Sequence, residues 1–252
     1  MEEKYLKHVR EVRVSLNDAD FTERLKPSAV MEYFQDIATE HAVMLGVGYE
    51  DMRANGLIWV AIRMSFKAFK SPAIDERLTV VTYPEKPQRV EADRGYYIYD
   101  KNGEVVALGT TKWCVLDNTA HKIQRCAPLF PFGDSAYIPR PPFEDANPKI
   151  APIMESDAAE GPFAYEVRLT DLDRNFHMNN TRYGDVILNT CGIEQLRNGR
   201  IARVDINFLS ELFFQDRYEV FKAQRGTLTV IEARKAGSGA PVFRAQVEWE
   251  PV

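Results

Sequence analysis

Prolines are concentrated in one part of this 252-residue chain, because eight of its 14 prolines fall between Pro128 and Pro162. Proline fixes the backbone and has no N–H to donate, so such a stretch cannot continue as a helix or as a central strand. We interpret residues 128–162 as a linker that runs extended over the surface, with some of its apolar side chains packed onto a domain. The linker separates residues 1–127 from residues 163–252, which we expect to form two domains.

The sequence before the linker shows a strand, a polar loop and a helix. Val12, Val14 and Leu16 alternate with polar or charged residues, which is typical of a strand. After the loop, Pro27 suits the first turn of a helix that we expect to end near Gly46. The apolar face of this helix carries, at helical spacing, Val30, Phe34, Ile37, Ala38 and His41.

The same order of patterns follows the linker. Val167 and Leu169 indicate a strand, a polar loop comes next, and Asn179 or Asn180 can cap a second helix. The apolar face of this helix carries Tyr183, Val186, Ile187, Thr190 and Ile193. The acidic residues of the two loops share one offset, so the chain contains an internal repeat.

Four strand patterns follow each predicted helix. They lie at 59–69, 76–84, 94–100 and 105–117 in the first half, and at 202–209, 217–224, 228–234 and 241–250 in the second. A helix that is apolar on one broad face can be wrapped by a curved antiparallel sheet. The sequence therefore predicts an α+β fold in which one helix-and-sheet unit occurs twice.

Composition and charge exclude several classes of protein. The chain is 45% hydrophobic and 27% charged, which is ordinary for a globular domain. Its net charge of -5 and its lack of a basic block argue against nucleic acid as a partner.

No apolar run approaches the roughly 18 residues of a membrane span, and the mixed-charge amino terminus is unlike a targeting segment, so we expect a cytoplasmic protein. The three cysteines form no CxxC pair, and no HExxH, P-loop, GxGxxG or GxSxG motif occurs, so we expect no metal and no cofactor.

The densest polar cluster of the chain lies just before the second helix, in the run DLDRNFHMNN. Asp173 and His177 can approach each other across a tight turn, where the carboxylate would orient the imidazole. The amide of Asn175 can donate to a carbonyl or hold a water, and free N–H groups at the start of the helix can stabilise an oxyanion. The alternative is a purely structural loop, because turns and helix caps also favour Asp and Asn.

The internal repeat distinguishes these two interpretations. The matching loop of the first half keeps an acid at Asp20 but has Thr22 and Arg24 in place of the asparagine and the histidine. Such a difference is expected if one copy carries chemistry and the other has become scaffold. A second candidate is Glu211, an acid among apolar residues, which suits a general base; its repeat counterpart is near Ser71. Glu211 can reach the cluster only if its strand ends or bulges near Ser210, and the alternative is a solvated glutamate at a strand end.

These residues resemble a known family. The run DLDRNFHMNNTRY resembles the signature of the acyl-acyl carrier protein (acyl-ACP) thioesterases, the plant and bacterial enzymes that end fatty acid synthesis. GLIWVAIRMSFKAF and GTTKWCVLD resemble the amino-terminal half of these enzymes, and INFLSELFFQD resembles the segment with their catalytic glutamate. The resemblance covers nearly the whole chain and implies a tandem (double) hotdog, each hotdog being a long helix wrapped by an antiparallel sheet. It implies that the catalytic set is Asp173, Asn175, His177 and Glu211.

Two departures from the plant members of the family affect the expected chemistry. Plant enzymes have a cysteine directly after the glutamate, where this sequence has Leu212, and Cys191 in the second helix is a poor substitute. We therefore expect no thiol nucleophile. The chain also shows no counterpart of the extra amino-terminal segment of the plant enzymes, so the resemblance implies the bacterial type.

The resemblance implies hydrolysis of fatty acyl-ACP to free fatty acid and ACP. The amino-terminal hotdog would supply the acyl tunnel, lined by Met31, Phe34, Ile37 and Ala38. The carrier protein is acidic, so a cluster of Lys and Arg should receive it, and Arg174, Arg182 and Arg200 are candidates. We expect either a monomer built as a pseudo-dimer or a homodimer. The alternatives are a hotdog thioesterase for coenzyme A esters, a hotdog hydratase, and a non-catalytic acyl-binding regulator.

Overall fold

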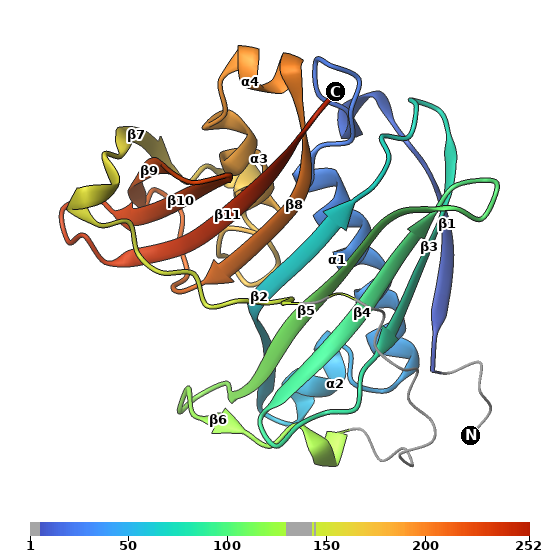
Figure 1. Cartoon of the computed structure of the whole chain (residues 1–252). Helices are drawn as coiled ribbons and strands as arrows, with labels where there is room; N and C mark the ends of the chain where they lie inside the picture. Colours follow the sequence, from blue (N-terminus) through green and yellow to red (C-terminus); the bar gives the residue numbers. More distant parts are fainter. Residues whose placement is uncertain (1–5, 130–142, 144) are drawn as a thin grey trace. The chain divides into compact units, whose positions relative to one another are not determined.

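The computed structural model describes residues 6–129, 143 and 145–252 (Figure 1). Residues 130–142 and 144 belong to the predicted linker, so much of its predicted extended course lies outside the described residues. The chain divides into two compact units. The amino-terminal unit comprises Met1–Leu16 and Glu32–Asn147, and the carboxyl-terminal unit comprises Asn17–Met31 and Pro148–Val252.

The amino-terminal unit is built on an antiparallel sheet with the strand order β1-β3-β4-β5-β2. Its strands are β1 (His8–Arg13), β2 (Leu57–Ala68), β3 (Arg77–Pro84), β4 (Glu91–Tyr99) and β5 (Val105–Asp117), and a short β6 (Ile123–Gln124) pairs with β5. The long helix α1 (Pro27–Met44) covers one face of this sheet, and the short helix α2 (Tyr49–Ala54) follows it (Figure 1).

The apolar face of α1 forms the core of the amino-terminal unit. Phe34 is fully buried, and its ring stacks on Tyr96 of β4 with 4.3 Å between the ring centroids. Gly109 of β5 leaves room for this ring, since a Cβ added there would lie 2.5 Å from it. The helix ends near Gly46 as predicted, because Gly46 has a φ of 70° and donates its N–H to the carbonyl of Val43.

The carboxyl-terminal unit repeats this plan. Its strands are β7 (Glu160–Glu166), β8 (Gly199–Phe208), β9 (Arg217–Arg225), β10 (Leu228–Lys235) and β11 (Pro241–Pro251), in the antiparallel order β7-β9-β10-β11-β8. Thus β7 takes the place of β1, and β8 to β11 take the places of β2 to β5. Two short helices, α3 (Arg182–Asn189) and α4 (Ile193–Asn198), precede β8. The predicted α+β fold, with one plan occurring twice, is confirmed.

The first strand of each unit ends earlier than the sequence pattern indicated. Leu16 and Leu169, which the alternation placed in strands, lie in exposed turns of 3-10 helix. The alternation extends past each strand because Val14 and Val167 are still fully buried. Their backbone N–H groups bond to the loops that precede β3 and β9, so the chain has already left the sheet edge.

The second helix is also shorter than predicted. We expected one helix that carried Ile193, but α3 ends at Asn189 and Ile193 begins the separate helix α4. The hydroxyl of Thr190 donates to the carbonyl of Ile187 at 2.7 Å, which closes the last turn of α3. Gly192 follows in an extended conformation and starts α4. The long helix of the hotdog pattern is therefore divided in this unit.

A segment of the predicted linker is fastened to the sheet of the carboxyl-terminal unit. Ile153 is buried in a cluster with side chains of β9 and β10. Its N–H donates to the buried carboxylate of Glu232 at 2.6 Å. Farther along, Arg225 of β9 donates to the carboxylate of Asp157 at 2.5 Å. Residues 148–158 thus lie across the sheet on a series of ionic and apolar contacts.

Candidate active site

The polar loop before α3 is closed by hydrogen bonds of Asp173. Its N–H donates to the carbonyl of His177 at 2.9 Å, and its carbonyl accepts the N–H of Phe176 at 3.1 Å. Its carboxylate accepts the N–H of Asn175 at 2.8 Å, which is the turn that Asp favours. Phe176 has a φ of 63°, a left-handed conformation that this tight loop requires. Asp173 therefore closes the loop, and its predicted part in catalysis stays a prediction.

The matching loop of the first repeat has the same backbone. The N–H of Asp20 donates to the carbonyl of Arg24 at 2.8 Å, and Glu23 has a φ of 59°. The carboxylate of Asp20 accepts the N–H of Thr22 at 2.7 Å. Position by position, Thr22 stands for Asn175 and Arg24 for His177. The turn itself requires only the aspartate, so the asparagine and the histidine are additions to a scaffold that both copies share.

Glu211 reaches this loop because its strand ends early. β8 stops at Phe208, which satisfies the condition set by the sequence pattern. The N–H of Met178 then donates to the carbonyl of Leu212 at 2.8 Å, and His177 pairs across this bridge with Phe213. This pairing brings the segment that carries Glu211 beside the imidazole.

The imidazole of His177 lies between two carboxylates. Its Nδ1 is 4.0 Å from Oδ1 of Asp173, and its Nε2 is 3.9 Å from Oε1 of Glu211. Both distances exceed hydrogen-bond length, and catalytic contacts often tighten only when substrate is bound. Glu211 is 49% exposed, so it is more solvated than the apolar run around it indicated. Asp173, His177 and Glu211 thus lie close together in the carboxyl-terminal unit, and Asn175 belongs to the same loop as Asp173 and His177.

Phe213 is a contact of His177 that the sequence did not predict. The two rings meet edge to face, with 5.6 Å between centroids and 85° between planes. Nζ of Lys235 lies 6.0 Å from the centroid of the same phenyl ring. The missed signal is the antiparallel pairing of residue 177 with residue 213, which places their side chains close together.

The start of α3 does not offer the free amides that we expected. The N–H of Thr181 donates to the side-chain oxygen of Asn179 at 2.9 Å. The N–H of Arg182 donates to the carbonyl of Asn179 at 3.0 Å, and that of Tyr183 to the carbonyl of Asn180 at 3.3 Å. The prediction of an oxyanion site from these amides is therefore wrong, because the tight first turn uses them.

The candidate thiol is partly buried, and the candidate acyl-binding residues are buried. Burial raises the pKa of Cys191 to about 12, so its thiol is poorly suited to act as a nucleophile. Leu212, at the position of the plant cysteine, is fully buried. The predicted acyl-binding residues of α1 are likewise buried: Met31, Phe34, Ile37 and Ala38.

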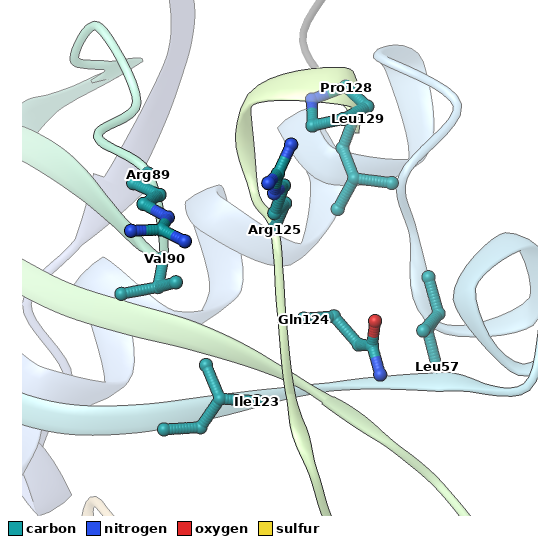
Figure 2. A pocket seen from close by; sticks show the side chains of 8 residues that line it. All are labelled: Leu57, Arg89, Val90, Ile123, Gln124, Arg125, Pro128 and Leu129. Carbon is teal, nitrogen blue, oxygen red and sulfur yellow. The ribbon is translucent and has the colours of Figure 1, made fainter.

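Other features of the described residues offer less chemistry. The amino-terminal unit has a pocket of about 670 Å³ (Figure 2). Its lining offers no carboxylate, histidine, serine or cysteine that could act as acid, base or nucleophile. The lining residues are Leu57, Arg89, Val90, Ile123, Gln124, Arg125, Pro128 and Leu129. Across residues 6–129 and 145–252, no group of three His, Cys, Asp or Glu is placed to hold a metal ion. No helix in this part of the chain has the length and apolar character needed to cross a membrane.

Two family models cover most of the chain. Residues 5–130 match the acyl-ACP thioesterase N-terminal domain, and residues 154–251 match the acyl-ACP thioesterase C-terminal domain. The chloroplastic oleoyl-acyl carrier protein thioesterase 2 of Arabidopsis thaliana is 24% identical over 216 residues, which are 81% of this chain and 58% of that protein. The chain thus spans a little over half the length of the plant relatives that it matches.

Two solved structures share the fold along nearly their whole length. An acyl-ACP thioesterase from Bacteroides thetaiotaomicron has a TM-score of 0.87 at 23% identity, covering 99% of this chain and 100% of its own. The 12:0-ACP thioesterase from Umbellularia californica has a TM-score of 0.84 at 19% identity, covering 98% of each chain. These likenesses support the tandem hotdog fold that the sequence resemblance implied.

Proposed function

Because this chain belongs to the acyl-ACP thioesterase family, we propose that it hydrolyses fatty acyl thioesters of acyl carrier protein (ACP) to free fatty acid and the carrier thiol. The observation that carries the proposal is the place of His177 between the carboxylates of Asp173 and Glu211. The repeat supports it, because the matching loop keeps the turn-forming aspartate and has Arg24 where the histidine stands.

The proposed reaction is direct attack by water. Glu211 and His177 together hold a water and remove one of its protons as the water oxygen bonds to the thioester carbon. The exposed amide of Asn175 donates to the carbonyl oxygen as it becomes an oxyanion. The carbon–sulfur bond then breaks, and the carrier thiolate takes up the proton that the base removed. Asp173 shapes the loop and orients His177.

A covalent route through cysteine is disfavoured by the surroundings of the two relevant positions. Leu212 follows the glutamate, and the partly buried thiol of Cys191 donates to the carbonyl of Ile187 at 3.3 Å. A thiol with a pKa raised to about 12 supplies very little thiolate near neutral pH. Water activated by Glu211 and His177 is therefore the simpler nucleophile.

The substitution Glu211→Ala tests this proposal. A positioned base typically contributes about 10²- to 10⁴-fold to the rate, so the variant should lose turnover of acyl-ACP on that scale and remain folded. Ser71→Ala is the matched control, because residues 71–76 form the same turn before β3 that residues 211–216 form before β9. Turnover by Glu211→Ala close to that of the wild type would refute the direct-water scheme.

The remaining parts of the proposal concern the acyl chain, the carrier and the cell compartment. The amino-terminal hotdog is proposed to receive the acyl chain along the buried face of α1, at Phe34, Ile37 and Ala38. Parallel assays with the same acyl group on ACP and on coenzyme A decide between the two carriers. A cytoplasmic location, and the choice between a pseudo-dimeric monomer and a homodimer, stay predictions from the sequence.

A further inference from the structure

The pocket of the amino-terminal unit combines apolar side chains with two guanidinium groups (Figure 2). Arg89 lies in the loop between β3 and β4, and Arg125 lies in the turn directly after β6. Binding sites for small molecules commonly have this composition, in which a largely apolar wall carries a few polar groups that orient the ligand. The apolar part of the lining comprises Leu57, Val90, Ile123, Pro128 and Leu129.

A backbone hydrogen bond holds the two arginine segments side by side. The N–H of Cys126 donates to the carbonyl of Arg89 at 3.2 Å, and the N–H of Leu129 donates to the carbonyl of Cys126 at 3.0 Å. Cys126 is fully buried in an apolar cluster of the core, against which Leu57 and Leu129 also pack. The turn that carries Arg125 is therefore anchored to the core next to Arg89, and both side chains line one pocket.

The two guanidinium groups have no protein partner within residues 6–129 and 145–252. In this part of the chain, the side chains of Arg89 and Arg125 make no hydrogen bond, ion pair or ring contact. Other arginines of the same unit are paired, for example Arg10 with Asp36 at 3.2 Å and Arg13 with Asp75 at 2.9 Å. Two like charges on one pocket disfavour each other, and an anion bound to both would remove this cost.

The nearest carboxylates along the chain are engaged elsewhere. Glu91 and Asp93 of β4 both pair with Lys112, at 2.8 Å and 3.0 Å. The carboxylate of Asp117 accepts two backbone N–H groups of the turn that follows it. The lining itself contains no carboxylate, so none of these acids serves as the anion of the pocket.

The wider neighbourhood of the pocket is close to neutral. Glu85 and Lys86 in the β3–β4 loop offset each other. Helix α2 carries Glu50, Asp51 and Arg53, and the carboxylate of Asp51 caps the start of its own helix. The affinity for an anion must therefore come from the two unpaired guanidinium groups themselves, through direct charge-assisted hydrogen bonds.

The loop that carries Arg89 is not required by the fold. In the carboxyl-terminal unit, β9 and β10 correspond to β3 and β4, and only Gly226 and Thr227 join them. In the amino-terminal unit, the same connection is made by residues 85–90. A tight turn thus suffices at this place, and the longer loop adds one wall of the pocket.

The composition of the lining selects among anions. A nucleotide base would need a surface on which to stack, and the lining has no aromatic side chain. Inorganic phosphate alone would leave the apolar wall in contact with water. A carboxylate on an alkyl chain satisfies both parts of the lining, because guanidinium groups bind carboxylates through paired N–H donors and the chain covers the apolar wall.

We propose that this pocket binds a free long-chain carboxylic acid, with its carboxylate on Arg89 and Arg125 and its alkyl chain on Leu57, Ile123 and Leu129. The site is separate from the predicted acyl-binding face of α1, with which its lining shares no residue. The proposed reaction releases an acid of this class, but binding to the pocket can be measured without turnover.

The experiment titrates decanoate into the full chain, labelled at the methyl groups of Ile and Leu, and follows the methyl signals by NMR. The signals of Ile123, Leu57 and Leu129 should shift in a saturable way. The double variant Arg89→Gln/Arg125→Gln should bind decanoate about tenfold more weakly or worse, because two charge-assisted hydrogen-bonding groups are lost. Ile123→Ser should weaken binding about threefold through loss of apolar contact.

Two variants of the same unit serve as matched controls. Arg53→Gln removes an exposed arginine of α2 that bonds to Tyr49 outside the lining. Val43→Ser removes an apolar side chain of α1 that is 61% exposed and also lies outside the lining. Both should keep the affinity for decanoate within about twofold of the wild type, as is usual for surface substitutions. Circular dichroism verifies that each variant keeps its fold.

The ligand class is tested with two further probes. Decanol, which has the chain without the charge, should bind about tenfold more weakly than decanoate, and inorganic phosphate should not displace decanoate. Equal affinity for decanol and decanoate, displacement by phosphate, or unchanged affinity in the double variant would overturn the proposal.

Binding at the predicted acyl-binding face is distinguished by its own signal. If decanoate also shifts the methyl signal of Ile37 in α1, that shift should persist in the double variant, because the two sites are separate. If decanoate binds at Ile123 and Leu129 but the chain does not hydrolyse acyl-ACP, the proposed function fails and the carboxylic acid site stands. If acyl-ACP is hydrolysed and no signal of the lining shifts, the site fails and the proposed function stands.

Discussion

Phe213 is predicted to hold His177 in position, so Phe213→Ala should loosen the imidazole without removing any reacting group. An edge-to-face pair such as this one, with 5.6 Å between centroids, contributes about 0.5–1.5 kcal/mol beyond burial. If the variant loses about 1 kcal/mol of this stabilisation in the transition state, kcat falls about fivefold. Phe213→Leu, which keeps apolar bulk without the ring edge, should recover part of the loss.

The assay uses a small acyl thioester, so that carrier docking does not enter the result. Leu209→Ala is a suitable control, because it removes an exposed apolar side chain from the same loop after β8. A double-mutant cycle on the free energy of unfolding, with Phe213→Ala and His177→Ala, measures the contact itself and needs no turnover. A coupling energy near zero together with unchanged kcat would refute the positioning role.

Two further predictions concern other parts of the chain. The Arg225 guanidinium, aided by the Met154 N–H, lowers the pKa of Asp157 from its usual 3.8 to about 2. A lowered carboxyl pKa adds stability above the unfolded-state pKa and loses it as the pH falls through the folded value. The melting-temperature difference between wild type and Asp157→Asn should therefore shrink between about pH 5 and pH 2, and a constant difference in thermal melts would contradict this. In α1, Ala38→Phe should shorten the fatty acids released in cells, as measured by gas chromatography, whereas Val43→Phe on the exposed side of the helix should not; an unchanged profile for Ala38→Phe would argue against a tunnel there.

The local geometry of the loop at Asp173 could be predicted from the sequence, because the groups that fix it are close together along the chain. Asp173 closes the turn through groups two to four residues away, and such short-range hydrogen bonds follow from residue type. The approach of Glu211 was conditional, since it depended on where β8 stops. Only the structure shows that β8 ends at Phe208 and that the next residues pair with the loop.

Other features escaped prediction for a different physical reason. The first-turn amides of α3 are used by carbonyls three residues earlier, a tight winding that helix periodicity cannot reveal. The helix breaks after Asn189, although the spacing of Thr190 and Ile193 fits the apolar face of a longer helix equally well. Phe213 and Phe214 appeared as apolar surroundings of Glu211, but both are substantially exposed. Periodicity reports burial on average and does not locate the ends of elements.

Arg24 has a structural role at the position that His177 holds in the second loop. Its guanidinium donates to the carbonyls of Leu196 at 2.9 Å and Gly199 at 2.7 Å, where α4 ends and β8 begins. A histidine at this position is too short and has too few donors to make both bonds in one geometry. The first loop can therefore fasten the carboxyl-terminal unit, or it can carry an imidazole, but one residue cannot do both. The aspartate turn is common to the two copies, and the residue four positions after the aspartate is Arg24 in one loop and His177 in the other.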